Sequence, residues 1–272
     1  MDILFPVVFF FFGTIIGSFL NVVILRLRTG RTLGGRSACF TCGMTLSFAE
    51  LVPIGSYLTQ RGRCANCRAK ISPQYVIVEA LTGLLFVFLY WRFAYLLLLS
   101  PGVFAGLFFY YAAAISVLIV LAAYDIRHKI LPDGLTAIFA LLAFAGMFVI
   151  AGDSFVLHLP PLGHFLAGVL IPVPFAALWL VSKGKWMGLG DAKLMIGIGW
   201  LLGMSAGVAA VLLSFWIGAA VALVWLATVR LSGRRGPSLT FAMPFGPFLA
   251  LGTVIVLLAR NDCASIVRLF AR

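Results

Sequence analysis

Long apolar runs separated by short polar breaks dominate the chain. The first run, residues 1–26, lacks a basic leading segment and a small-residue cleavage site, so it predicts a retained membrane helix rather than a cleaved signal peptide. Hydropathy, together with the Gly, Pro and charge breaks, places seven further runs at about 76–98, 103–124, 134–151, 162–182, 192–207, 209–230 and 240–259. The pattern predicts about eight transmembrane helices.

The division between the sixth and seventh runs is the weakest part of this pattern. The stretch "WLLGMSAGVAAVLLSFW" has only Gly and Ser to mark a turn, and Gly is common inside membrane helices. A single helix over this stretch would reduce the count to seven.

Composition agrees with a membrane protein and excludes an ordinary soluble domain. Hydrophobic residues make up 63% of the 272 residues and charged residues 10%, whereas soluble domains carry roughly 25% charged residues. A soluble core cannot cover that much apolar surface, but a bilayer accepts it. The predicted fold is therefore an all-α polytopic membrane protein, and each of its eight Asp and Glu residues near a span is a candidate for function.

The basic residues give an orientation to the predicted helices. Of the twenty Lys and Arg residues, sixteen fall in segments 26–70, 127–129, 183–193 and 230–235. With eight spans these segments all lie on one side, which the positive-inside rule assigns to the cytoplasm, and the N-terminus lies outside. Topology thus accounts for the net charge of +12, and no nucleic-acid partner is expected.

One segment, residues 27–73, is polar and carries four of the five cysteines. They form two CxxC pairs separated by 21 residues: Cys39, Cys42, Cys64 and Cys67. Each pair can supply two thiolates to one tetrahedral ion, so the spacing favours a structural zinc site that holds a small cytoplasmic domain together. A redox pair and disulfides are the alternatives, and disulfides are disfavoured on a cytoplasmic face. Cys263 lies far from this segment and is given no role.

Two aspartates fall at the same predicted membrane boundary. Asp125 ends the third apolar run in "LAAYDIRHKILPDG", and Asp191 opens the sixth in "GLGDAKL". Either residue alone would be read as an interfacial charge or a helix cap. Two close carboxylates in a partly dry site share a proton, so one can act as base on a water while the other donates to a carbonyl. Asp133 is a third candidate, but "PDG" is also an ordinary helix-start signal.

The residues around Asp191 fit a peptide substrate. Gly188 and Gly190 remove side chains on both sides of Leu189, which allows unusual backbone angles and the close approach of another backbone. An extended peptide lying there would satisfy backbone groups that a membrane otherwise leaves unpaired.

Several ordered motifs together resemble a known family. The segments "MGLGDAKL" and "YDIRHKILPD" resemble the two aspartate motifs of the type IV prepilin peptidases, which are membrane aspartic proteases of the GxGD class. The resemblance extends over the chain through "GSFLNVVILRL", "RGRCANC", "ISPQYVIVEALTGLLF" and "MPFGPFLALG". It implies that Asp125 and Asp191 are the catalytic pair and that the four cysteines belong to the zinc domain of the family.

The resemblance also implies a substrate and a second activity. Such enzymes cut a short basic leader after a glycine from precursors of type IV pilins and of the pseudopilins of type II secretion. They act at the cytoplasmic face of the bacterial inner membrane, and many then methylate the new N-terminus with S-adenosylmethionine. No glycine-rich loop with a downstream acid marks a methyl-donor site in this chain, so methylation rests on resemblance alone.

The candidate residues fall into groups by expected role. Supporting or substrate-binding candidates are Gly188, Gly190, Lys193 and Asp133, and methylation candidates are Asn21, Arg26, Glu50 and Glu79. The small residues along "GTIIGSFLN" are expected to serve helix packing.

The expected domain organisation is a first membrane helix (1–26), a four-cysteine zinc domain (27–73) and a transmembrane peptidase core (74–272). A transporter or channel with functional span-end aspartates is the alternative function, although it would leave the zinc domain and the glycine motif unexplained.

Overall fold

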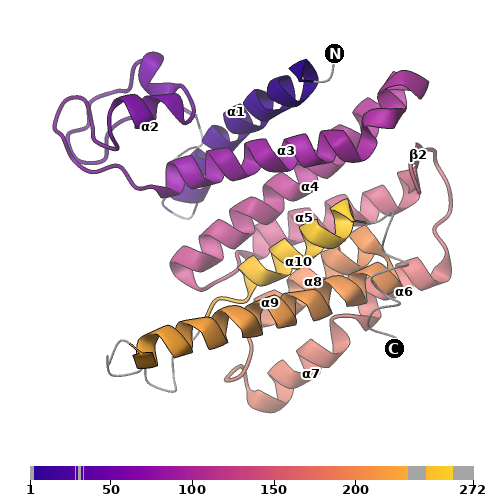
Figure 1. Ribbon diagram of the computed structural model, residues 1–272. Helices are drawn as coiled ribbons and strands as arrows, with labels where there is room; N and C mark the ends of the chain where they lie inside the picture. The colour runs from indigo at the N-terminus through magenta and orange to yellow at the C-terminus, as the bar shows by residue number, and fades with distance from the viewer. Residues whose placement is uncertain (1–2, 28, 30–31, 33, 232–242, 260–272) are drawn as a thin grey trace. The chain divides into compact units, whose positions relative to one another are not determined.

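The computed structural model describes residues 3–27, 29, 32, 34–231 and 243–259, and this part of the chain is mostly helical (Figure 1). Contacts divide the chain into two compact units, Met1–Val120 and Leu121–Arg272. The boundary falls inside one long helix, α4 (Pro101–His128), so the last two turns of that helix belong to the second unit.

The first unit is built on two long helices that pack against each other, α1 (Leu4–Arg26) and α3 (Gln74–Leu99) (Figure 1). Between them the chain makes a loop-rich segment with one 3₁₀ turn, η1 (Ala49–Leu51), and one short helix, α2 (Gly55–Thr59). The segment has little regular structure because it is short and polar. The first five turns of α4 complete the unit.

Two glycines let α1 and α3 approach closely. A Cβ atom added at Gly13 would lie 2.8 Å from the Cα of Gly83, and one added at Gly17 would lie 2.7 Å from the Cα of Glu79. These pairs ascend along α1 and descend along α3, so the helices run antiparallel. The spacing of the two glycines is the small-xxx-small pattern by which membrane helices pack. The packing role expected for this stretch is confirmed.

Replacing Gly17 by Ala is expected to lower the stability of the first unit. The added methyl meets backbone, which cannot rotate away, so the helices must separate at a cost of about 1–3 kcal/mol. Thermal unfolding of the purified chain in detergent would measure the loss. Gly102→Ala is the matched control, because Gly102 also lies in a helix of this unit and nothing lies within 4 Å of its added methyl. Equal midpoints for the two variants would contradict the close packing.

Helix α8 (Leu189–Leu202) lies at the centre of the second unit. It contacts five other helices, and its side chains at Leu194, Met195 and Ile198 are fully buried. The elements around it are α5 (Asp133–Val149), a hairpin of β1 (Ile150–Ala151) and β2 (Ser154–Phe155), α6 (Leu162–Leu170), α7 (Val173–Ser182), α9 (Met204–Leu231) and α10 (Gly246–Leu258).

Helices α5 and α8 run parallel. Asp133 at the start of α5 contacts Lys193 in the first turns of α8, and further along both helices Phe139 packs against Gly197. The contacts therefore ascend together in both helices, which places the amino ends of α5 and α8 at the same end of the unit.

The structure confirms a mostly helical membrane-type fold and adds detail to the predicted runs. Within the described residues, five helical stretches are long and apolar enough to cross a bilayer: Leu4–Arg26, Gln74–Leu99, Pro101–His128, Leu162–Ser182 and Met204–Leu231. Helices α5 and α10 are apolar but shorter, and α8 has 14 residues. The run at 162–182 consists of two helices, α6 and α7, which meet at Pro172, because proline cannot donate the backbone bond that would continue α6.

The predicted break between the sixth and seventh runs lies too far along the chain. Helix α8 ends at Leu202 rather than at residue 207, Gly203 is the residue after it, and α9 begins at Met204. Gly203 has φ +80° and ψ −177°, a conformation that only glycine adopts easily. Gly207 stays helical and packs against Ile171. Hydropathy could not distinguish the two glycines because both lie in equally apolar sequence. Residues 240–242 of the last run lie outside the described part of the chain.

Candidate active site

Asp125 lies in the last turn of α4 and is buried, with 5% of its surface exposed. Its Oδ2 atom accepts a hydrogen bond of 2.9 Å from the backbone N–H of Gly246, the first residue of α10. A carboxylate at a helix amino end accepts from an otherwise unpaired N–H and interacts favourably with the helix dipole. The start of α10 thus fixes the orientation of this side chain.

Asp191 lies in the first turn of α8 and is partly exposed. Its carboxylate lies close enough to that of Asp125 for the two charges to interact. The structure therefore brings together the two aspartates that the sequence placed at one boundary, from helices that are about 60 residues apart in the chain. Such a pair can hold one proton between two carboxylates, which is the arrangement that activates a water and polarises a carbonyl.

A leucine side chain packs against the start of α8 and the start of α10. Leu131, in the connection between α4 and α5, is buried. A Cβ atom added at Gly190 would lie 3.0 Å from its Cβ, and one added at Gly246 would lie 3.1 Å from its Cδ2. Glycine at these two positions leaves room for Leu131. The start of α8 and the start of α10 thereby both approach the loop that follows Asp125.

The glycines before Asp191 act through their small size rather than through unusual dihedrals. Gly188, the residue before α8, has φ −74° and ψ 142°, which any residue adopts, and Gly190 is already helical. Gly188 is exposed, and the nearest atom to its added methyl is Asp191 Oδ2 at 3.7 Å. The backbone in front of α8 is therefore open on the side of the Asp191 carboxylate.

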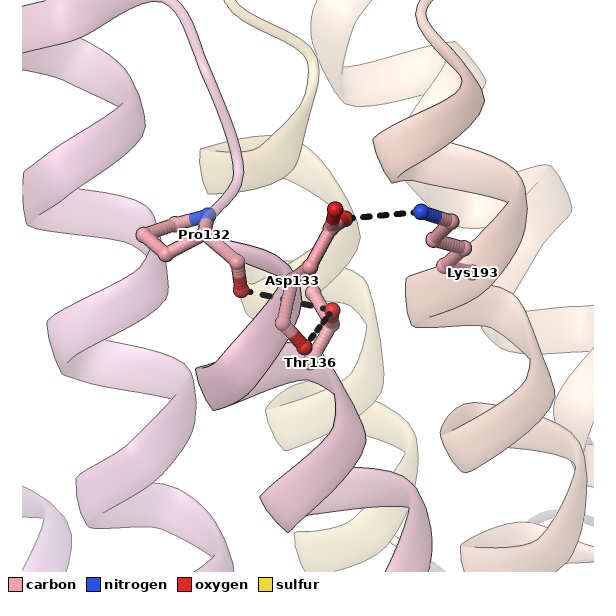
Figure 2. Close-up of polar contacts among 4 residues, drawn as sticks. All are labelled: Pro132, Asp133, Thr136 and Lys193. Carbon is pink, nitrogen blue, oxygen red and sulfur yellow. Dashed lines mark hydrogen bonds and ion pairs between the residues drawn. The ribbon is translucent and has the colours of Figure 1, made fainter.

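Asp133 and Lys193 form an ion pair between α5 and α8. Lys193 Nζ lies 2.8 Å from Asp133 Oδ1, and Figure 2 shows the two side chains extended toward each other. Asp133 is the first residue of α5, as the helix-start signal in the sequence predicted. Thr136 donates to the carbonyl oxygens of Pro132 and Asp133, as Figure 2 also shows. The carboxylate of Asp133 thus engages the helix that carries Asp191.

The four cysteines of the first unit form one cluster. All four sulfur atoms lie within 4.8 Å of one another, and Cys39 Sγ lies 3.8 Å from Cys67 Sγ. A tetrahedral ion with Zn–S bonds of about 2.3 Å holds its sulfurs about 3.8 Å apart. The four thiols are free, so the cluster matches a metal site better than disulfides.

Each CxxC pair is held by its own set of backbone hydrogen bonds, and the two sets have the same pattern. The N–H of Cys39 donates to Met44 and the N–H of Gly43 donates to Cys39, while the equivalent bonds join Cys64 with Ala69 and Arg68. Gly43 and Arg68 occupy equivalent places, and both have positive φ. Backbone N–H groups of Cys42 and Thr41 donate to Cys39 and lower the pKa of its thiol to about 6, so a thiolate is available at neutral pH.

The methylation candidates separate into two kinds. Asn21 donates to the carbonyl of Tyr75 but leaves its buried Oδ1 without a hydrogen-bond partner, and buried Glu79 accepts from the N–H of Ile54. The two side chains lie on the facing surfaces of α1 and α3. Asn21 thus leaves one buried acceptor atom without a partner, whereas Glu79 accepts hydrogen bonds from Ile54 and from the side chain of Ser18.

Arg26 and Glu50 make local contacts. Arg26 donates to the carbonyl oxygens of Thr32 and Gly34 in the loop that follows α1. The N–H and the hydroxyl of Ser47 donate to Glu50 and lower the pKa of its carboxyl group. The described contacts of these two residues thus hold loop structure.

Two family profiles match the chain. Residues 11–93 match "Bacterial Peptidase A24 N-terminal domain", and residues 112–223 match "Type IV leader peptidase family". A "Prepilin leader peptidase/N-methyltransferase" of Bacillus subtilis is 33% identical over 95% of this chain and 96% of its own length. The chain belongs to the type IV leader peptidase family. It is therefore an enzyme of the peptidase class, and the transporter alternative is not favoured.

Other relatives give the same result. Proteins with the same name from Aeromonas hydrophila and Xanthomonas campestris are 32% and 30% identical, over 92% of this chain and 89% and 90% of their own lengths. No solved structure matches the chain significantly. Within this leader peptidase the first profile covers the four cysteines, and the second covers both Asp125 and Asp191.

Sequence reasoning missed two residues of the candidate site, Gly246 and Leu131. The Gly-Pro pair in "MPFGPF" is a helix-start signal and could have located the N–H that Asp125 accepts. Leu131 gave no signal, because a leucine before a proline in a short connection is common.

Replacing Gly246 by Ala is expected to lower peptide cleavage by roughly tenfold or more, since misplacement of a reacting group by about 1 Å costs up to a hundredfold. The added methyl would lie 2.7 Å from Asp125 Oδ2 and displace that carboxylate. Cleavage rates of a prepilin in detergent would measure the change. Gly163→Ala, in helix α6 with nothing within 4 Å of the added methyl, is the control and should cut normally. Gly190→Ala should also impair cleavage, because its methyl meets Leu131.

Proposed function

We propose that this leader peptidase cuts the basic leader from type IV prepilins and from pseudopilin precursors, after a glycine, with Asp125 and Asp191 as its catalytic pair. The observation that carries the proposal is the meeting of these two carboxylates at one end of the second unit, one buried and one partly exposed.

The geometry gives each residue a task in hydrolysis. One carboxylate of the pair takes a proton from a water as it attacks the scissile carbonyl, and the other donates a proton to the carbonyl oxygen. Gly246 holds Asp125 in place through its N–H. Gly188 and Gly190 leave the backbone open beside Asp191, where an extended substrate can supply the missing backbone partners.

For topology, we propose eight crossings with both ends of the chain outside the cytoplasm. Helices α1 and α3 are antiparallel, and α5 and α8 are parallel, so one crossing must lie between α5 and α8. Helices α6 and α7 together supply that crossing. The positive-inside rule then places the basic loops and the aspartate pair at the cytoplasmic face of the bacterial inner membrane.

Labelling of single cysteines tests this orientation. A reagent that cannot cross the membrane should reach a cysteine introduced at Ser154, in the hairpin after α5, and should not reach one introduced at Ser37. The opposite pattern would put the aspartate pair on the wrong side.

We further propose that the cysteine cluster holds Zn²⁺ as a structural ion within a cytoplasmic domain of residues 27–73. Four protein ligands leave no open coordination position, so the ion organises the loops rather than taking part in cleavage. The domain boundaries 1–26, 27–73 and 74–272 remain part of this proposal.

The proposed second activity is N-methylation of the new N-terminus with S-adenosylmethionine as donor. Its support within the chain is the pair of buried acceptors on α1 and α3, Asn21 Oδ1 and the Glu79 carboxylate, which suit an ammonium or hydroxyl donor. Arg26 and Glu50 make local contacts, and Glu50 Oε1 is a further acceptor atom without a hydrogen-bond partner.

The experiment that tests the function is mass spectrometry of a pilin N-terminus. The chain is produced together with a prepilin in cells that lack their own leader peptidase. Loss of the leader after a glycine, with the added mass of one methyl group, is the expected result. An unchanged precursor in the presence of the folded chain would refute cleavage, and a cut but unmethylated N-terminus would refute only the second activity.

A further inference from the structure

We propose that the ion pair between Lys193 and Asp133 is a positioning device that fixes the start of α8, and with it Asp191, relative to Asp125. The proposal rests on the function proposed above and deepens it. It concerns the second unit alone, in which all of these residues lie.

The Lys193 side chain extends from α8 toward α5. Residues two apart on a helix point to different sides, so Lys193 does not face Asp191 although both lie in the first turns of α8. The Lys193 ammonium contacts Asp133 instead, at 2.8 Å (Figure 2). Its positive charge is thereby directed toward α5 and away from the aspartate pair.

The other contacts of the first turn of α8 come from small residues, because Gly190 lies against Leu131 and Ala192 is buried. Gly188 and Gly190 offer no side chains, and glycine leaves the backbone more free than any other residue. Further along α8, its own side chains, such as Leu194 and Ile198, are fully buried and hold the helix in the unit. Lys193 is thus the first long side chain of α8 after Asp191 that ties this turn to a neighbouring helix.

The two charges of the ion pair lie near the amino ends of their helices. A cation in the first turn of a helix opposes the helix dipole, whereas an anion there is favourable. Asp133 is the first residue of α5, a place that its helix dipole favours, whereas Lys193 lies one turn into α8. The ion pair thus joins the amino end of α5 to the second turn of α8, directly after Asp191.

The exposure of the pair separates positioning from stability. The side chains of Lys193 and Asp133 are 41% and 69% exposed, and exposed ion pairs contribute little to folding. Loss of the pair should therefore leave the chain folded. Misplacement of a catalytic group by about 1 Å can nevertheless reduce the rate by roughly a hundredfold.

A double-mutant cycle on the full chain in detergent, with a prepilin as substrate, tests the proposal. Lys193→Met and Asp133→Asn are each expected to lower kcat by roughly tenfold to a hundredfold while KM stays within about twofold. The double variant should be no worse than either single one, because both remove the same contact. Lys193→Arg, which keeps the pair, should retain most of the rate.

Controls distinguish the possible failures. Lys185→Met removes a positive charge from the exposed segment before α8 and should cut normally. Asp125→Asn should abolish cutting, and if it does not, the proposed catalytic pair itself is wrong. If Asp125→Asn is inactive while Lys193→Met and Asp133→Asn both cut at the normal rate, only the positioning role is refuted. Losses that appear in KM, or that multiply in the double variant, would also refute it, since they indicate independent contacts with the basic leader.

Discussion

Replacing either Asp125 or Asp191 by Asn is expected to abolish cleavage of a prepilin. Each change removes the base or the shared proton, and residues that act as one unit show similar, non-additive losses. We expect a fall of roughly a hundredfold or more for each single variant, and the double variant should look like the single ones. Initial rates with purified chain and a full-length prepilin would measure the loss.

The stability of these variants must be measured beside their activity. Each should keep its zinc content and its thermal midpoint, because loss of activity through unfolding says nothing about chemistry. A folded Asp125→Asn or Asp191→Asn variant that cuts at a near normal rate would show that the pair is wrong. If only Asp133→Asn abolished cutting completely, the partner of Asp191 would have been misassigned.

Glutamate at either position provides a finer measurement of the same site. Glu keeps the charge but adds one methylene, which displaces the carboxylate by about 1 Å, so the rate should still fall by roughly a hundredfold. At Asp125 the longer side chain would also disturb the 2.9 Å bond from Gly246. A rate close to normal would indicate that charge alone matters and that position does not.

Replacing Cys39 or Cys64 by Ser is expected to remove most of the bound zinc. The purified chain should carry about one zinc ion, and a site that loses one of four thiolates binds it far less tightly. Methylation should fall further than cleavage, because the cysteine cluster and the methylation candidates lie in the first unit and the aspartate pair lies in the second. Metal analysis together with both activity assays would measure this.

Cys263→Ser is the control for these variants and should keep the full metal content. A strong chelator should reproduce the effect of Cys64→Ser, and added zinc should reverse the effect of the chelator only. A purified chain without stoichiometric metal, or with a native disulfide between Cys42 and Cys67, would contradict the zinc site.

Features that depend on short stretches of sequence could be predicted well. The apolar runs gave α1, α3 and α4 within a few residues, because a bilayer-spanning helix requires a long uninterrupted apolar stretch. The CxxC spacing gave the cysteine cluster, because two-residue gaps set a knuckle geometry locally. The meeting of Asp125 and Asp191 could be predicted because both acids fall at the same predicted membrane boundary, which limits their separation.

Features that depend on distant contacts could not be predicted. The bond from Gly246 to Asp125 spans 121 residues, and the pair of Lys193 with Asp133 spans 60. The sequence around each of these residues does not indicate which distant residue it contacts. Asp133 was expected to start a helix and is the first residue of α5, but only the structure shows that its carboxylate pairs with Lys193 of α8. The turn at Gly203 could not be predicted either, because hydropathy carries no information on backbone dihedral angles.

The antiparallel packing of α1 and α3 has a consequence for the cysteine-bearing segment between them. Asn21 near the end of α1 bonds to Tyr75 at the start of α3, so the two points where the segment leaves and re-enters the helices are held side by side. The entropy of closing a loop of this length is thereby lost when the helices pair and does not burden the later ordering of the loops. A metal ion held by the four cysteines would then have to organise only two small knuckles.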